Sequence, residues 1–275
     1  MNSVNKGVWS DESINRYRKE YSRQYNGGYK MKQDSSTISW NQLGQEWIEL
    51  AQGESRMYFI MPYMLELLGD VRGKKILDLG CGEGGYAREL AKRNAEVVAV
   101  DCSEYAIGYA EEQATGLSIQ HFIRNSNDLY GIEDGTFDIV LCSMMLMDCE
   151  DLKGTIRETA RVLKPSGRMF ASILHPCFNG NHSEGIGRQG EGINREVVVK
   201  NYFSPSFWEA PLPKGETSVI WRHRTLEEYV KAFVQNGLTI VDLNEPQSTK
   251  EQAEISTAIA WLQKIPLFLF WEVVK

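Results

Sequence analysis

The segment Ile76 to Gly85, ILDLGCGEGG, limits the possible folds of this chain more than any other. It begins within a short apolar run, Lys75 to Leu79, which is typical of a buried strand, and continues into a glycine-rich turn. Ala87, Leu90 and Ala91 then recur at helical spacing. A strand, a tight turn and a helix in direct succession form the first part of a parallel α/β unit.

Further apolar runs continue this pattern along the chain. They lie at Val97 to Val100, Ile119 to Ile123, Phe137 to Cys142, Met169 to Leu174, Leu238 to Leu243 and Leu267 to Val274. Helical faces separate most of them, but no strong helix separates the last two. We therefore predict an α/β fold with a Rossmann-like, doubly wound, seven-stranded and mostly parallel sheet whose last strand is antiparallel.

Two regions depart from this alternation. Residues 1–70 are helical in pattern and rich in aromatic side chains, which predicts an N-terminal helical cap. Residues 71–275 form the main predicted domain, with a glycine-rich, partly strand-like insertion at about 175–222. A connection of that length inside a compact domain is usually a lid or a binding segment.

Composition excludes several classes of function. The net charge of -7, with no block of like charges in the body of the chain, argues against a nucleic acid partner. We expect no membrane partner and a cytoplasmic location, because the chain has no long apolar run and no secretory signal. The five cysteines have no metal-ligand spacing, so we expect reduced thiols and no metal. A monomer or a homodimer is expected.

Ligands of an open parallel sheet bind beyond the carboxyl ends of its strands, where the glycine turn lies. Gly80, Gly82 and Gly85 match the GxGxxG pattern, which is also compatible with a nicotinamide or flavin dinucleotide. Asp78 favours a different ligand, because its carboxylate would repel a pyrophosphate and attract the ammonium and sulfonium groups of S-adenosylmethionine. Asp101, at the end of the second strand, can accept both ribose hydroxyls of either ligand.

Several segments in this order resemble one family. They are ILDLGCGEGG, VVAVDCSEYAIGYAE, RNSNDLYGIEDGTFDIVLCSMML and ARVLKPSGRMFASILHP, and HRTLEEYVKAFVQNGLTIVDLNEP follows later. The chain resembles the class I S-adenosylmethionine-dependent methyltransferases, especially the bacterial small-molecule branch (methyltransferase types 11 and 25) that includes quinone-biosynthesis enzymes. The resemblance implies S-adenosylmethionine as the cofactor, S-adenosylhomocysteine as its product and a small-molecule methyl acceptor.

The resemblance also implies a role for individual residues. Gly80, Cys81 and Gly82 would line the methionine part of the cofactor through their backbone, and Asp78 would steer its amino group. Asp101 would hold the ribose. The remaining cofactor-binding candidates are Cys102, Asn125 and Ser126 near the adenine, Ser143 and Met144 beneath the ligand, and Tyr25 on a closing N-terminal helix.

Methyl transfer from a sulfonium mainly requires alignment of the acceptor and exclusion of water, so no catalytic triad is needed. If the acceptor carries a proton, His175 or His223 is a candidate catalytic base; each could instead have only a structural hydrogen bond. The candidate substrate-binding residues are Tyr21, Met147, His175, Tyr202 and Trp221. Relatives often have a histidine where this chain has Met147, which leaves that histidine's role without a counterpart.

The chain lacks an NPPY-type tetrad after the fourth strand, a paired-glutamate loop and an Asp/Asn metal cluster. The expected function is therefore metal-free methyl transfer from S-adenosylmethionine to an O, N or C atom of a small metabolite. Two alternatives stay open: an NAD(P)-dependent Rossmann oxidoreductase and a non-catalytic S-adenosylmethionine-binding protein.

Overall fold

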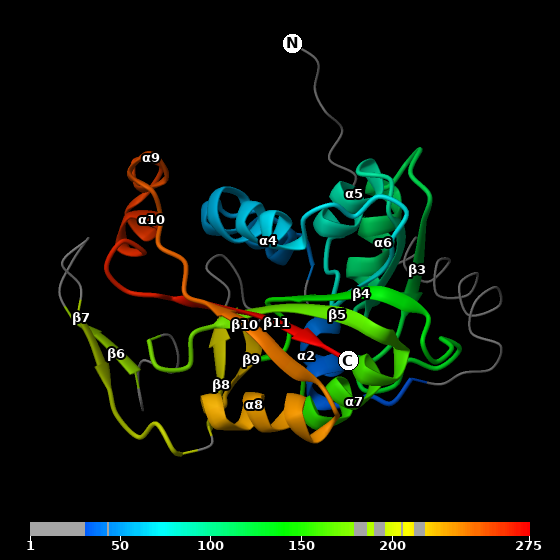
Figure 1. Ribbon diagram of the computed structural model, residues 1–275. Helices are drawn as coiled ribbons and strands as arrows, with labels where there is room; N and C mark the ends of the chain where they lie inside the picture. The colour runs from blue at the N-terminus through cyan, green and yellow to red at the C-terminus, as the bar shows by residue number, and fades with distance from the viewer. Residues whose placement is uncertain (1–30, 43, 179–185, 190–195, 205, 212–217) are drawn as a thin grey trace, which may run out of the picture.

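A single seven-stranded sheet organises the main domain (Figure 1). The computed structural model describes residues 31–42, 44–178, 186–189, 196–204, 206–211 and 218–275. The strands are β1 (Lys75–Leu79), β2 (Glu96–Asp101), β3 (Ile119–Ile123), β4 (Phe137–Ser143), β5 (Leu163–Leu174), β10 (Thr239–Asn244) and β11 (Phe268–Val274). Their spatial order is β10-β11-β5-β4-β1-β2-β3.

The strand directions confirm the predicted fold class. Strands β1 to β5 are mutually parallel, and β11 pairs antiparallel with both β5 and β10. The chain order reverses between β1 and β4, which places the topological switch point at the carboxyl end of β1. This is the end that carries the glycine turn.

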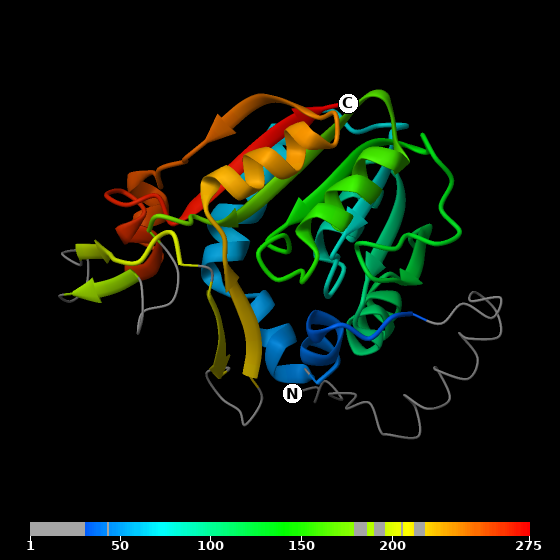
Figure 2. The same cartoon turned by 90° about the horizontal axis from the view of Figure 1, so that it is seen from below.

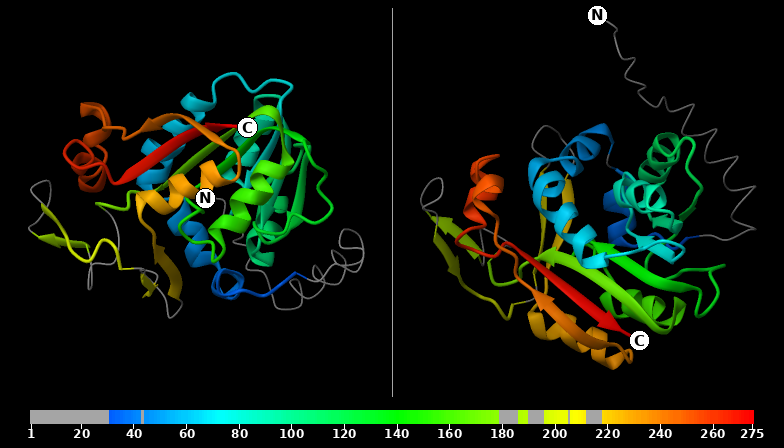
Figure 3. Two further views of the ribbon diagram at one scale, coloured as in Figure 1. Left: turned by 60° about the horizontal axis from the view of Figure 1, so that its bottom comes forward. Right: turned by 45° about the horizontal axis from the view of Figure 1, so that its top comes forward.

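Helices cover both faces of the sheet. One face carries α4 (Met61–Leu68), α5 (Gly85–Lys92) and α6 (Glu104–Gln113), and the other carries α7 (Leu152–Val162) and α8 (Leu226–Gln235) (Figures 1 and 3). Side chains alternate along each strand, so β1 sends Ile76 into one core and its neighbour Leu77 into the other. Both strand faces are therefore buried, as a parallel sheet requires.

The N-terminal cap and the insertion lie next to each other at the ligand edge. The described part of the cap contains α2 (Ser35–Asn41), α3 (Gln45–Ala51) and the π-helix η1 (Arg56–Ile60), which runs into α4. The described part of the insertion forms two hairpins, β6 (Ile186–Gln189) with β7 (Glu196–Val199) and β8 (Ser206–Pro211) with β9 (Ser218–His223). Figure 2 shows α2 beside β9, where the Ile220 backbone N–H donates to the Ser39 hydroxyl.

The last two strands are joined by more structure than the sequence pattern indicates. Two short helices, α9 (Lys250–Ala253) and α10 (Thr257–Trp261), lie between β10 and β11. Neither spans the sheet as a crossover helix would, so the two strands still pair antiparallel as predicted.

Helix α8 begins with a capping box formed by Thr225 and Glu228. The Thr225 hydroxyl accepts from the Glu228 backbone N–H at 3.3 Å, and the Glu228 carboxylate accepts from the Thr225 N–H at 2.8 Å. We expect Thr225→Ala to lower the free energy of unfolding by about 1 kcal/mol, because it leaves a helix N–H without its acceptor. Urea unfolding followed by circular dichroism measures the change. Thr225→Ser keeps the hydroxyl and should recover most of it; an equal loss in both variants would contradict the capping explanation.

Candidate S-adenosylmethionine-binding site

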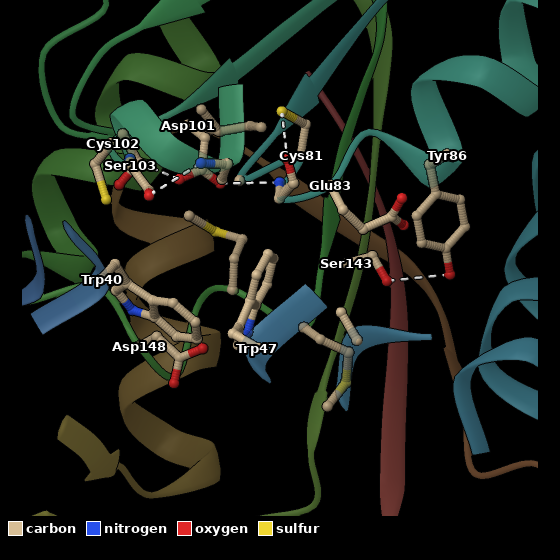
Figure 4. Close-up of a pocket in the computed structure, with 18 of the residues that line it drawn as sticks. Trp40, Trp47, Cys81, Glu83, Tyr86, Asp101, Cys102, Ser103, Ser143 and Asp148 are labelled. Carbon is tan, nitrogen blue, oxygen red and sulfur yellow. Dashed lines mark hydrogen bonds between the residues drawn. The ribbon is translucent and has the colours of Figure 1, made fainter. Parts of the chain in front are cut away.

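A cavity of about 520 Å³ lies at the carboxyl ends of β1, β2 and β4 (Figure 4). Its volume is within the range of small-molecule and cofactor sites. The turn after β1 and the ends of β2 and β4 form one part of its wall, and residues of α2, α3 and β9 complete it. The described cap and insertion therefore do cover the ligand edge of the sheet.

The glycine turn is held against β2 by three backbone donors. The N–H groups of Gly80 and Cys81 both donate to the Val100 carbonyl, and the Gly82 N–H donates to the Asp101 carboxylate at 2.9 Å. Gly82 has a φ of +55°, and a Cβ there would collide with the Trp47 ring. Only glycine suits this position, because it tolerates the left-handed backbone and leaves room for the ring.

Asp101 and Cys102 line the cavity directly beside this turn. The second Asp101 oxygen accepts from the Ser103 N–H at 2.9 Å, and the backbone N–H and the thiol of Cys102 also hydrogen-bond to this carboxylate. Burial raises the pKa of Asp101, against the lowering effect of these backbone donors. Cys102 carries a free thiol whose pKa burial raises well above its ordinary value, so it is neutral.

Asn125 joins the end of β3 to the N-terminal cap. Its side-chain amide donates to Asp34 at 2.7 Å and to Thr37 at 3.1 Å, and Asp34 also caps α2. The amide nitrogen is thus directed toward α2. The amide oxygen, whose described contact is a long 3.4 Å bond from the Asn127 N–H, keeps capacity to accept from a ligand.

Three other predicted cofactor residues also line the cavity: Ser126, Ser143 and Met144. The Ser143 hydroxyl donates to the Tyr86 hydroxyl at 3.1 Å (Figure 4). Met144 has a φ of +57°, which is unusual for a residue with a side chain and marks a constrained turn after β4. The predicted grouping of these residues is thus present in space.

Asp78 lies beneath the turn and does not line the cavity. It is 1% exposed, accepts a hydrogen bond from the Ala87 N–H, and its Oδ2 has no partner among the described residues. Burial raises its pKa to about 7, against the attraction of Arg56. Any effect of Asp78 on a ligand would therefore be electrostatic and would act across the turn.

Glu83, within the glycine-rich segment, forms two buried ion pairs that the sequence pattern does not predict. Glu83, 2% exposed, pairs with Arg56 at 2.5 Å and with Arg88 at 2.6 Å. Burial alone would raise the Glu83 pKa, but the two arginines hold it below its ordinary value. Glu83 thus links η1 to α5 across the start of that helix.

The two predicted catalytic histidines lie outside this cavity. His175 Nε2 lies 2.8 Å from Glu245, and its Nδ1 accepts from the Cys177 N–H. Its burial lowers its pKa. His223 Nε2 bonds the Tyr202 carbonyl at 2.8 Å. The structure brings neither ring to the predicted cofactor residues.

The predicted substrate residues divide into three groups. Trp221 lines the main cavity and also a small second pocket, which Met147 and the candidate base His223 line with it. Tyr202 lines neither pocket; its hydroxyl accepts from the Leu226 N–H and its carbonyl bonds the His223 ring. Tyr21 and Tyr25 fall outside the residues that the structure describes.

The cavity also contains residues that sequence reasoning did not assign to the site. They include Trp40, Trp47, Arg56, Glu83, Tyr86 and Asp148. Only Asp148 had a usable signal, since it is a carboxylate a few residues beyond a buried strand. Within the described residues, no cluster of three metal-ligating side chains occurs, and no helix has the length and apolarity needed to cross a membrane.

Glu83 should contribute stability that depends on pH. We expect Glu83→Gln to lower the free energy of unfolding at pH 7 by roughly 2–4 kcal/mol, because it leaves two arginines facing a neutral group. Since the folded pKa is lowered, the wild-type advantage is present above about pH 4.5 and is lost as the pH falls through the folded pKa. Urea unfolding at several pH values tests this. Glu89→Gln removes a half-exposed acid of α5 that pairs with Lys92; it is the matched control and should change little.

Asp78 should make the stability of the folded protein depend on pH in the opposite direction. Its folded pKa of about 7 exceeds its ordinary value of 3.8, so wild-type stability falls as the pH rises between these two values. We expect Asp78→Asn to become progressively more stable relative to wild type from pH 5 to pH 8. Unfolding curves of both proteins across that range measure the difference, and a difference independent of pH would show that Asp78 is already ionised in the folded protein.

Comparison with known proteins agrees with this geometry. Residues 77–171 match a family described as a methyltransferase domain. A ubiquinone biosynthesis O-methyltransferase of Xanthomonas oryzae is 30% identical over 138 residues, covering 48% of this chain and 58% of the relative. One from Vibrio campbellii is 34% identical over 152 residues, covering 52% and 63%. The chain thus spans about 60% of the length of the curated relatives it matches.

The fold comparison extends over more of the chain. An S-adenosylmethionine-dependent methyltransferase from Mesorhizobium loti superposes with a TM-score of 0.69 at 24% identity, covering 82% of this chain and all of that structure. The glycine turn, the strand order and the family match therefore all indicate the same fold. Residues 77–171 thus match the methyltransferase-domain family, and the chain has the fold of the Mesorhizobium loti S-adenosylmethionine-dependent methyltransferase.

Proposed function

We propose that this protein transfers a methyl group from S-adenosylmethionine to a small molecule. The observation that carries the proposal is the position of the Asp101 carboxylate, which lines the cavity beside the glycine turn and is fixed by the backbone N–H groups of Gly82, Cys102 and Ser103. The relatives named as O-methyltransferases favour an oxygen atom as the acceptor. Nitrogen and carbon acceptors are the alternatives.

The cavity residues fit this cofactor. Asp101 would accept the ribose hydroxyls, and Cys102, Asn125 and Ser126 would surround the adenine. The methionine part would lie along the turn at Gly80 to Gly82, near Ser143 and Met144. When bound, the cofactor supplies an electrophilic methyl group. The chain's own contribution is to orient it and to exclude water with α2 and α3.

The charges around the cavity favour a cationic ligand over a pyrophosphate. Carboxyl groups of Asp101 and Asp148 face it, and Asp78 lies beneath it. The lining arginines have other partners: Arg56 pairs with Glu83, and Arg124 donates to the carbonyls of Ile123 and Tyr130. A dinucleotide would bring its pyrophosphate to acidic groups that ionise more readily beside a cation than beside an anion, and the lining arginines are engaged by protein groups, which argues against the oxidoreductase alternative.

The remaining expectations form part of the same proposal. All five cysteines carry free thiols, in keeping with a reduced, cytoplasmic protein. We further propose action on a metabolite without a metal ion, and without a nucleic acid or membrane partner, as a monomer or a homodimer.

Titration calorimetry with S-adenosylhomocysteine and with NAD tests the cofactor, and transfer of a labelled methyl group to a panel of one-ring phenols and amines tests the activity. Binding of NAD alone would overturn the proposal. Binding of S-adenosylhomocysteine without transfer to any acceptor would favour a non-catalytic binding protein.

Asp101 provides a sharper test of the binding mode. We expect Asp101→Asn to weaken S-adenosylhomocysteine binding by about tenfold or more, because an amide offers one acceptor oxygen where the carboxylate offers two. Calorimetry measures the dissociation constant. Glu133→Gln changes an exposed carboxylate outside the cavity and should leave it unchanged. Unaltered affinity in Asp101→Asn would place the ribose elsewhere.

A further inference from the structure

Asp148 presents a buried carboxyl group to the cavity. It follows β4 in a tight turn, where its N–H donates to the Met145 carbonyl, and it is 8% exposed. Its backbone carbonyl accepts from Ser36 and Arg222, but among the described residues no group donates a hydrogen bond to its carboxyl. A buried acid without a protein partner costs stability, which indicates a partner outside the protein.

Two arginines fix the position of this group without neutralising it. Arg222 donates to the Asp148 carbonyl and to the hydroxyls of Ser35 and Ser36. Arg224 donates to the carbonyls of the flanking residues Leu146, Met147, Cys149 and Glu150. The turn is thus held through its backbone by the end of the β8–β9 hairpin and by α2. The carboxyl is left to face the cavity.

The surroundings of the carboxyl suit a flat apolar ligand. Trp40, Trp47 and Trp221 line the same cavity, and we call these three rings with Asp148 the tryptophan chamber. Trp40 and Trp47 meet edge to face at 5.5 Å. In the view of Figure 4, the Trp40 ring lies beside Asp148, and the Trp47 ring lies between Asp148 and the glycine turn at Cys81. The chamber therefore adjoins the predicted cofactor residues and is formed mainly by other parts of the chain.

We propose that the tryptophan chamber binds an aromatic acceptor whose O–H or N–H group donates to the Asp148 carboxylate, which receives that proton during transfer. The inference rests on the proposed function. In the transfer step the acceptor heteroatom forms a bond to the methyl carbon, the carbon–sulfur bond breaks, and its electron pair stays on sulfur. The proton lost by the heteroatom passes to Asp148 and then to solvent.

The electrostatics of the site agree with a base of this kind. Burial raises the pKa of Asp148 to about 8, while Arg222 and Arg224 act in the opposite direction. The other titratable groups that interact with it are Cys149 and Tyr229, whose own pKa values are raised by burial and which are neutral near pH 7. A base with a pKa near the working pH suits proton transfer, and its ionised fraction grows as the pH rises through 8.

The test compares phenol and anisole, which have similar size but differ in the O–H donor. Their binding is measured by ligand-detected NMR at pH 7 and pH 9, with and without saturating S-adenosylhomocysteine. We expect wild type to prefer phenol by about tenfold or more at pH 9, where Asp148 is mostly ionised and the bond is to a charged acceptor. The preference should increase toward pH 9, where phenol itself, with a pKa near 10 like that of tyrosine, is still mostly neutral.

Two variants separate the roles of Asp148. Asp148→Leu should bind both probes alike. Asp148→Asn keeps an acceptor oxygen and should retain a weaker preference for phenol that no longer depends on pH. Glu133→Gln, outside the cavity, should behave as wild type. Equal binding of the two probes to wild type, or an unchanged pH-dependent preference in both Asp148 variants, would overturn the inference. Failure of S-adenosylhomocysteine to bind would instead count against the proposed function, because the probe comparison does not require it.

Discussion

The hydrogen bond from the Gly82 N–H to the Asp101 carboxylate is the contact on which the site depends. It ties the turn after β1 to the end of β2, where the Val100 carbonyl accepts two further N–H groups of the same turn. These bonds keep the backbone of Gly80 to Gly82 open toward the cavity and orient the Asp101 carboxylate beside it. Without them, the edge of the sheet would lack both the cradle and the acceptor that a nucleoside ligand needs.

The cap closes over this edge through polar contacts that are themselves buried. Asp34 and Thr37 bind Asn125 at the end of β3, Ser36 binds the turn after β4, and Ser39 accepts from β9. Hydrogen bonds of this kind contribute about 1 kcal/mol each and can be exchanged with water. Closure by such contacts is compatible with opening for ligand exchange, whereas an extensive apolar interface would resist it.

The sequence allowed prediction of the sheet and of the cofactor side of the cavity because both have local signals. Each strand is an apolar run, and Gly80, Asp101 and Ser143 stand at or just beyond strand ends. On the acceptor side, Asp148 also stands beyond a strand end, but Trp40 and Trp47 have no such signal and meet it only when the N-terminal cap folds over the sheet. His175 had a signal of this kind but does not reach the site. It follows the end of β5, which β4 separates from β1, and at that position its ring is hydrogen-bonded to Glu245.

Three carboxyl groups, Asp78, Asp101 and Asp148, stand in or under one cavity, and burial raises the pKa of each. Their charged forms are costly without a cation nearby, so a cationic ligand that enters the cavity should favour their ionisation and release protons. Ligand binding and proton release are then linked, and the affinity for a cation should grow with pH as these groups ionise. The same burial that reduces stability in the absence of a ligand thereby favours a sulfonium over a phosphate.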